Sequence, residues 1–261
     1  MARWEAQSAI ASLRKSGYTA SAAAMQINAS ERLIVALDVP SADDAKKLVS
    51  QLDGVVSFFK VGLELYTATG PEFVRWLVSQ QKRVFLDLKF LDIGETVRRA
   101  SREAARLGAS FLTVHESGPT VAAAVQGCQG TDLKILAVTV LTSMDIGDLH
   151  EMGITCSVEE LVLRRAKKAM AAGCHGVIAS GQEAAALREK LGKDFLIVTP
   201  GIRPSGTSAD EQKRAVTPAD AIRDGADYLV VGRPITRAPN PRDATTTILE
   251  EMQKAFDALR T

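Results

Sequence analysis

The sequence predicts one closed barrel of eight parallel strands, each followed by helix, which is the (β/α)8 fold. Short runs rich in β-branched residues recur roughly every 28 residues from residue 32 onward, and alanine-rich helical segments separate them. Eight such units over about 230 residues match the usual size of this barrel. The expected strands are residues 33–37, 55–61, 83–88, 110–114, 133–140, 175–179, 195–199 and 228–231.

The expected strands are continuously apolar, which is typical of parallel strands that are buried on both faces. Amphipathic segments such as 41–52 and 95–107 supply the helices that would cover the outer face. An open, doubly wound sheet is the alternative fold. It usually has fewer strands and a glycine-rich turn after the first one, whereas Asp38 is followed here by Val-Pro-Ser-Ala. The closed barrel is therefore the favoured fold.

The chain divides by composition into a leader and one catalytic domain. Residues 1–30 are rich in alanine and serine, carry Arg3, Arg14 and Lys15, and contain Glu5 as their single acid. This composition resembles an organellar transit peptide only faintly, and we expect a weakly structured or helical leader without chemistry. Residues 31–261 are expected to form the barrel.

Charge, hydropathy and cysteine usage exclude several classes of partner. Lys and Arg number 32 against 31 Asp and Glu, so bulk electrostatics favour neither nucleic acid nor membrane binding. No run approaches the roughly 18–20 apolar residues of a membrane span. The three cysteines show no metal-ligand spacing and no disulfide framework. They are typical of a reducing compartment, and we expect a cytoplasmic protein.

A barrel of this kind places its catalytic residues at the carboxyl ends of the strands and in the loops that follow them. Polar and charged residues recur at these positions in the sequence. A focused site that binds an anion is therefore expected there, although the chain as a whole is nearly neutral. The residues concerned are Asp38, Lys60, Asp87, Lys89, His115, Thr142, Arg203 and Arg233.

The end of the third strand carries the sharpest chemical signal. Because side chains alternate along a strand, Asp87 and Lys89 should point into the barrel mouth while Leu86 and Leu88 point toward the helices. A buried Asp and Lys are costly unless they pair. The alternative interpretation is an ion pair that merely plugs the barrel.

Asp92 and Lys60 each have a simpler local interpretation. Asp92 stands three residues before Glu95 at the start of a helix, which is the pattern of an N-cap with a capping box. Lys60 could be a surface lysine at a strand end. Taken together with Asp87 and Lys89, however, they could form a chain of alternating cations and anions, an arrangement that surface residues have little reason to adopt.

A phosphate site is predicted after strands seven and eight. Residues 203–218 form a long polar loop of the kind that often acts as a lid, with a surface excursion as the alternative. Gly232 would let a phosphate approach the backbone, and Arg233 could bind it with two hydrogen bonds. We expect His115 to be mainly structural, or to support residues that contact the ligand.

Several segments resemble the orotidine 5′-phosphate decarboxylase family. The most specific is 85–97, which contains Asp87, Lys89 and Asp92 as Asp-x-Lys-x-x-Asp. That element alone also occurs in sister families, whereas the whole ordered set of segments is specific. The resemblance covers residues 32–261 and extends through 36–40, 60–62, 137–143, 199–204 and 231–235.

The resemblance implies removal of the C6 carboxylate of orotidine 5′-monophosphate, without metal or organic cofactor. It implies that Lys89 protonates C6, that Asp87 lies beside the departing carboxylate, and that Lys60 links the aspartates with the ribose. It further implies a homodimer with shared sites, in which Asp92 enters the partner's site together with Ile93 and Thr96. The other implied substrate contacts are Asp38, Thr142, Ser143, Pro200, Arg203, Gln212, Gly232 and Arg233.

Two other functions remain as alternatives. A sugar-phosphate decarboxylase or lyase of the sister branch would bind Mg²⁺ through a glutamate at the end of strand two, but Lys60 stands there and would repel a metal ion. A non-catalytic barrel that binds nucleotides would have no need for a proton donor between two acids. The decarboxylase is therefore favoured over both.

Overall fold

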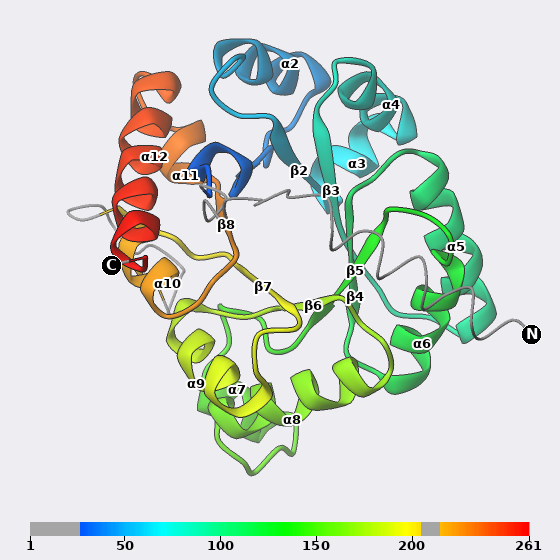
Figure 1. Cartoon of the computed structure of the whole chain (residues 1–261). Coiled ribbons are helices and arrows are strands. Elements are labelled where there is room, and N and C mark those ends of the chain that lie inside the picture. Colours follow the sequence, from blue (N-terminus) through cyan, green and yellow to red (C-terminus); the bar gives the residue numbers. More distant parts are fainter. Residues whose placement is uncertain (1–26, 205–214, 261) are drawn as a thin grey trace, which may run out of the picture.

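A computed structural model describes residues 27–204 and 215–260 and contains a closed barrel of eight parallel strands (Figure 1). Each strand pairs with its neighbours in chain order, and β1 closes the barrel on β8. The predicted fold class is confirmed. The strands are β1 Leu33–Ala36, β2 Phe58–Gly62, β3 Arg83–Phe90, β4 Phe111–His115, β5 Lys134–Val138, β6 Gly176–Ile178, β7 Leu196–Thr199 and β8 Tyr228–Val231.

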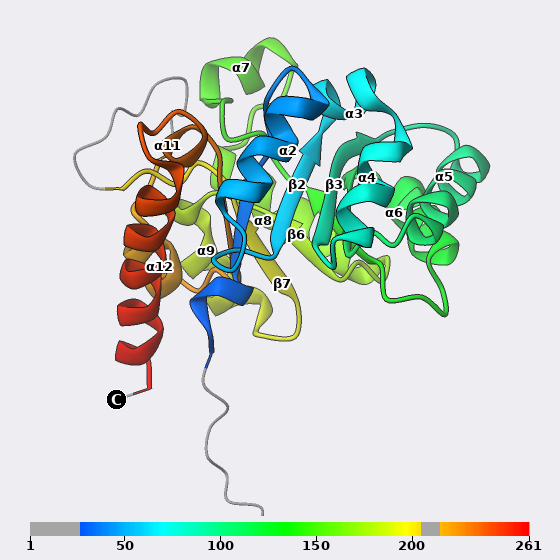
Figure 2. The same cartoon turned by 90° about the horizontal axis from the view of Figure 1, so that it is seen from above.

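Helices surround the barrel, and the short helices α3, α7 and α11 lie together at one end of it (Figure 2). These three follow β2, β5 and β8, so they mark the end at which the strands have their carboxyl termini. The described helices are η1 Ala29–Glu31, α2 Ala42–Gln51, α3 Leu63–Thr69, α4 Pro71–Ser79, α5 Gly94–Arg106, α6 Gly118–Gly127, α7 Ile146–Glu151, α8 Val158–Ala171, α9 Gly181–Leu191, α10 Pro218–Arg223, α11 Arg233–Thr236 and α12 Pro241–Ala258.

The largest boundary differences from the sequence prediction are at the second and fifth strands. Strand two was expected over 55–61, but Val55 and Val56 belong to the turn that ends α2, where both backbone N–H groups donate to the carbonyl of Leu52. Gly54, with φ of 75°, makes this turn possible. Strand five covers only Lys134–Val138 of the expected 133–140. Hydrophobic pattern alone does not separate a strand from an adjoining apolar turn.

The described part of the leader is short. Residues 27–30 contact α12, where the Ala29 N–H donates to Gln253 Oε1 at 3.0 Å and Gln253 Nε2 donates to the Ile27 carbonyl at 3.1 Å. The rest of the leader prediction lies outside the described residues. Within the described ranges, no helix is long and apolar enough to span a membrane. The three cysteines are free thiols.

The barrel interior is filled at one level by apolar and aromatic side chains. The rings of Phe58, Phe111 and Tyr228 meet edge to face, with Phe111 centroids 5.1 Å from each of the other two. A larger second core lies between the strands and the helices. Residues two positions further along each strand point to the same face. The next inward level, toward the carboxyl ends, is therefore formed by residues such as Lys60, Asp87 and Thr113.

Candidate active site

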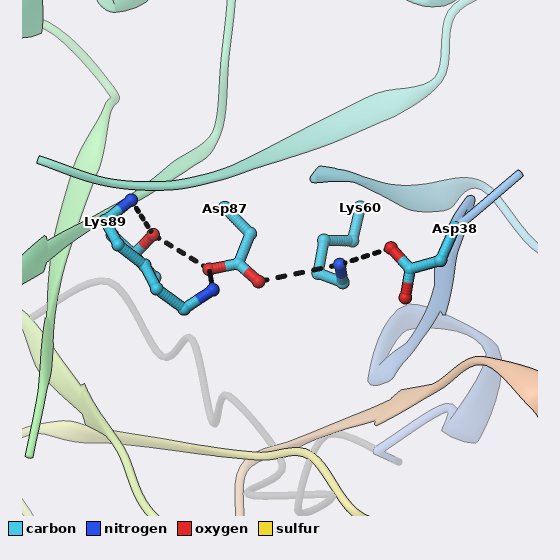
Figure 3. A network of polar contacts seen from close by, with 5 residues as sticks. Asp38, Lys60, Asp87 and Lys89 are labelled. Atoms are coloured by element: carbon cyan, nitrogen blue, oxygen red, sulfur yellow. Dashed lines mark hydrogen bonds and ion pairs between the residues drawn. The ribbon is translucent and has the colours of Figure 1, made fainter. Parts of the chain in front are cut away.

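Four charged side chains form a continuous row across the carboxyl end of the barrel (Figure 3). Lys60 Nζ lies 2.8 Å from Asp38 Oδ1 and 3.5 Å from Asp87 Oδ2, and Lys89 Nζ lies 2.9 Å from Asp87 Oδ1. The row contains two cations and two anions, so its charges balance. The predicted alternation of charge is therefore present for Lys60, Asp87 and Lys89, with Asp38 at the end of the row.

Burial and charge act in opposite directions on the two central groups. Burial disfavours the ammonium form of Lys60, but the carboxylates of Asp87 and Asp38 outweigh it and raise the pKa of Lys60. Burial likewise disfavours the carboxylate of Asp87, but Lys60, Lys89 and the Thr113 hydroxyl hold its pKa below the ordinary value. Both groups are therefore charged at neutral pH.

Asp87 and Lys89 meet as predicted, but the backbone between them is not a regular strand. The pairing of β3 with β4 runs through Leu86↔Leu112 and resumes at Phe90↔Val114, so four residues of β3 oppose two of β4. Lys89 has φ of 49°, in the left-handed region. The contact between Asp87 and Lys89 was therefore predicted correctly, but the regular alternation of side chains along a strand is not its cause. A bulge at this point aims Lys89 back at Asp87.

The simpler local interpretation of Asp92, as the N-cap of the following helix, is wrong. Helix α5 begins at Gly94 and its N-cap is Ile93, while Asp92 Oδ1 accepts a hydrogen bond from the Ile93 N–H at 2.6 Å. Glu95 pairs with Arg98 and Arg99 instead of reaching back toward the helix start, and their hydrogen bonds lower the pKa of Glu95 to about 2. A capping box would need Asp92 directly before the first helical residue, and Ile93 holds that position instead.

A cavity of about 540 Å³ opens beside the charged row. It brings together the expected residues from the ends of β1, β2, β3, β5, β7 and β8. Arg203 is almost fully buried, and its Nη1 donates to the Ile202 carbonyl at 2.9 Å. The predicted site residues that line the cavity are Asp38, Lys60, Asp87, Lys89, Thr142, Ser143, Pro200, Arg203, Gly232 and Arg233.

Three of the described site residues that were predicted are not brought to this cavity. Asp92, Ile93 and Thr96 are exposed and are not part of its lining in the described chain. Gln212 lies outside the described residues. His115 is half-buried and is also not part of the described lining; burial, Lys89 and Arg165 lower its pKa.

Sequence reasoning missed three polar residues of the site. Glu64 and Arg237 line the cavity, and buried Thr113 contacts Asp87 and Lys89. A weak signal existed for Arg237, which lies four residues after Arg233, about one helical turn along α11. Thr113 could have been found only from its inward position two residues after Phe111.

The fold and the site together define the class of the protein. Charged side chains from several strand ends converge on one cavity at the carboxyl end of a closed barrel, where enzymes of this fold have their active sites. Arg203, Arg233 and Arg237, together with the Gly232 backbone, line the part of the cavity that follows β7 and β8. The chain is therefore an α/β-barrel enzyme with a site suited to an anionic substrate.

The family model described as "Orotidine 5'-phosphate decarboxylase / HUMPS family" matches residues 31–248, and the chain belongs to this family. A curated protein of Nitrobacter winogradskyi, named orotidine 5'-phosphate decarboxylase, is 54% identical over 232 residues, which are 89% of this chain and 95% of that protein. One of Afipia carboxidovorans with the same name is 51% identical over 228 residues, covering 87% and 97%. The resemblance seen in the sequence is thus confirmed.

Solved structures agree with these matches. The crystal structure of orotidine 5'-phosphate decarboxylase from Lactobacillus acidophilus superposes with a TM-score of 0.76 at 38% identity, covering 85% of this chain and 99% of that one. An uncharacterized conserved protein from Geobacillus kaustophilus gives a TM-score of 0.74 at 36% identity, covering 84% and 99%. The description of the family model names two groups of proteins, and both curated relatives carry the name of the first.

Proposed function

We propose that this chain decarboxylates orotidine 5′-monophosphate to uridine 5′-monophosphate, a step of pyrimidine biosynthesis, without a metal or organic cofactor. The observation that carries the proposal is the balanced row of Asp38, Lys60, Asp87 and Lys89 in the wall of the cavity. Membership of the family and curated relatives at 54% and 51% identity support the reaction.

The substrate carries charge at both ends, and the cavity has matching groups at separate places. Arg203, Arg233 and the Gly232 backbone are assigned to the phosphate, because arginine binds phosphate with paired hydrogen bonds. Asp38 and Lys60 are assigned to the ribose hydroxyls. The loop after β5 would contact the pyrimidine through Thr142 and Ser143, with Pro200 and Gln212 as further contacts. This arrangement would place C6 beside Asp87 and Lys89.

The chemistry then follows from the charges in the row. The bond from C6 to the carboxylate carbon breaks, CO₂ leaves, and the electron pair stays on C6. The ammonium of Lys89 stabilises this developing negative charge and donates a proton to C6. Its neutral amine then regains a proton from water. Asp87 repels the substrate carboxylate, and this repulsion disappears as CO₂ departs.

The position of Lys60 argues against the metal-dependent alternative. Its ammonium lies between the carboxylates of Asp38 and Asp87, at 2.8 and 3.5 Å. A divalent cation bound by these carboxylates would have to displace a lysine whose pKa they raise. No cluster of three or more metal-ligating side chains occurs within residues 27–204 and 215–260.

The activity can be tested by following the ultraviolet absorbance of orotidine 5′-monophosphate with chelator present. Wild type should turn over, Lys89→Ala should lose at least about 1000-fold in kcat, and Lys254→Ala, an exposed lysine on α12, should match wild type. An inactive wild type or a fully active Lys89→Ala would refute the proposal. Activity that is lost with chelator would favour the metal-dependent alternative.

We also propose a homodimer in which Asp92, Ile93 and Thr96 complete the partner's site. Ile93 and Leu91 follow β3 and are 73% and 63% exposed, and Leu63 follows the neighbouring β2 and is 57% exposed. Exposed apolar side chains that follow neighbouring strands are typical of an interface. This dimer and the cytoplasmic location remain predictions, as does the lack of nucleic-acid and membrane partners.

Two measurements test the dimer. In analytical sedimentation, wild type should be dimeric and Ile93→Lys should be monomeric. Leu259, which follows the last helix and is 57% exposed, provides the control, and Leu259→Lys should remain dimeric. Mixing inactive Lys89→Ala with inactive Asp92→Ala should restore up to roughly a quarter of the wild-type activity, because a mixed dimer has one intact site. A monomeric wild type, or mixed chains without activity, would refute the shared site.

A further inference from the structure

Thr113 on β4 contacts two neighbouring residues of the charged row, Asp87 and Lys89. Its side chain is fully buried at the level above Phe111. The hydroxyl donates to Asp87 Oδ1 at 2.9 Å and accepts from the Lys89 backbone N–H at 3.0 Å. One hydroxyl therefore uses its donor for the carboxylate and its acceptor for the backbone of the lysine.

The backbone of β3 explains why this hydroxyl is needed. In the bulge between Leu86 and Phe90, the regular ladder to β4 is interrupted, and Lys89 adopts a left-handed φ of 49°. This conformation is costly for a residue with a Cβ atom and persists only where surrounding contacts hold it. A buried N–H also needs an acceptor. The Thr113 hydroxyl replaces the acceptor that a regular strand would have supplied.

The same hydroxyl restrains the carboxylate. Asp87 Oδ1 accepts hydrogen bonds from the Thr113 hydroxyl and from the Lys89 ammonium, while Oδ2 pairs with the Lys60 ammonium. Rotation of the carboxylate would break the contact with Thr113 and alter both ion pairs. Asp87 and Lys89 are therefore tied together twice, through the ammonium of Lys89 and through Thr113.

We propose that Thr113 is a positioning residue for the decarboxylation, which holds the Asp87 carboxylate and the Lys89 backbone in the geometry that the proton transfer requires. This inference rests on the proposed function. Thr113 acts through its neighbours, since Asp87 and Lys89 line the cavity and Thr113 is not among its described lining residues.

The decisive experiment compares two variants. Thr113→Val keeps the shape of the side chain but removes the hydroxyl, whereas Thr113→Ser keeps the hydroxyl. Thr113→Val should lower kcat about 10- to 100-fold with KM changed less than about threefold, because misplacement of reacting groups costs this much. Thr113→Ser should stay within about threefold of wild type. Thr245→Val removes an equally buried threonine hydroxyl on α12, one that donates to the Pro241 carbonyl, and should leave kcat unchanged.

Two readouts separate positioning from a purely structural role. Amide hydrogen exchange at Lys89 should become at least tenfold faster in Thr113→Val and remain slow in Thr113→Ser and Thr245→Val. The acidic limb of the kcat profile should move to higher pH in Thr113→Val alone, since the hydroxyl helps keep the pKa of Asp87 low. A merely structural threonine would change unfolding temperature without moving either readout.

The outcomes distinguish this inference from the proposed function. A wild type without activity on orotidine 5′-monophosphate refutes the proposed function. An active wild type with Thr113→Val equally fast, or with Thr113→Ser as slow as Thr113→Val, refutes the positioning role. If Thr113→Val does not fold, Thr113→Ala takes its place in the same comparison.

Discussion

Asp87→Asn would remove the central anion of the row while keeping the shape of the side chain. The carboxylate contacts Lys89 at 2.9 Å, Thr113 at 2.9 Å and Lys60 at 3.5 Å. Without this charge, Lys89 loses its ion pair with Asp87, and Lys60 keeps Asp38, whose side chain is 55% exposed. The variant therefore leaves a surplus of positive charge in a largely buried place.

The expected loss of stability follows from this burial. Breaking a buried ion pair by removing one partner costs about 3–5 kcal/mol. Because the Asp87 side chain keeps 16% exposure at the cavity wall, the lower end applies, about 3 kcal/mol. A chain of this size loses roughly 2–4 °C in Tm per kcal/mol, so Tm should fall by roughly 6–12 °C.

Calorimetry at pH 7 measures this shift against a matched control. Asp53→Asn breaks an ion pair with Lys82 in which the Asp53 side chain is 72% exposed, so solvent screens the charge and little stability is lost. Its Tm should change by less than about 4 °C. Equal shifts in the two variants, or a rise in Tm for Asp87→Asn, would show that the row does not stabilise the barrel as argued.

Two further predictions concern the same row. Because the pKa of Asp87 is lowered, its contribution to stability is present above roughly pH 5 and is lost as the pH falls through that lowered pKa. Because the pKa of Lys60 is raised, its contribution to stability is present below roughly pH 9 and is lost as the pH rises through that raised pKa. The Tm difference between wild type and Asp87→Asn should therefore be flat from roughly pH 5 to 9 and shrink outside that range, and a steady slope within it would contradict the assignment. Gly62→Ala would place a Cβ 3.0 Å from Lys60 Nζ and 3.1 Å from Asp38 Oδ1, which would displace these charged groups, so kcat/KM should drop by about tenfold. The Tm should change little, because the φ of −92° at Gly62 is a backbone conformation that any residue can adopt. Gly118→Ala, whose Cβ would meet nothing within 4 Å, is the control, and equal activity in both variants would refute the steric argument.

Local patterns in the sequence predicted well what depends on local periodicity. The eight strands follow from the hydrophobic pattern, with observed ends within a few residues of the predicted ones. Helix α2 was predicted at 41–52 and is observed over Ala42–Gln51, with Ser41 as its N-cap. The same reasoning failed at Asp92. Ile93 instead of Asp92 precedes the first residue of α5, and Glu95 pairs with Arg98 and Arg99, three and four residues along the same helix, instead of reaching the helix start.

The sequence by itself determined the fold class, the family and the strand ends at which charged residues would gather. It did so because periodicity, strand-end position and ordered motifs are properties of short stretches of chain. Only the tertiary structure decided that Asp38 rather than Asp92 joins the row within one chain, that Thr113 supports it, and that Glu64 and Arg237 face the cavity. These contacts join segments tens of residues apart, and the register between strands and the bulge in β3, which the pattern of a single strand does not encode, determine which side chains meet.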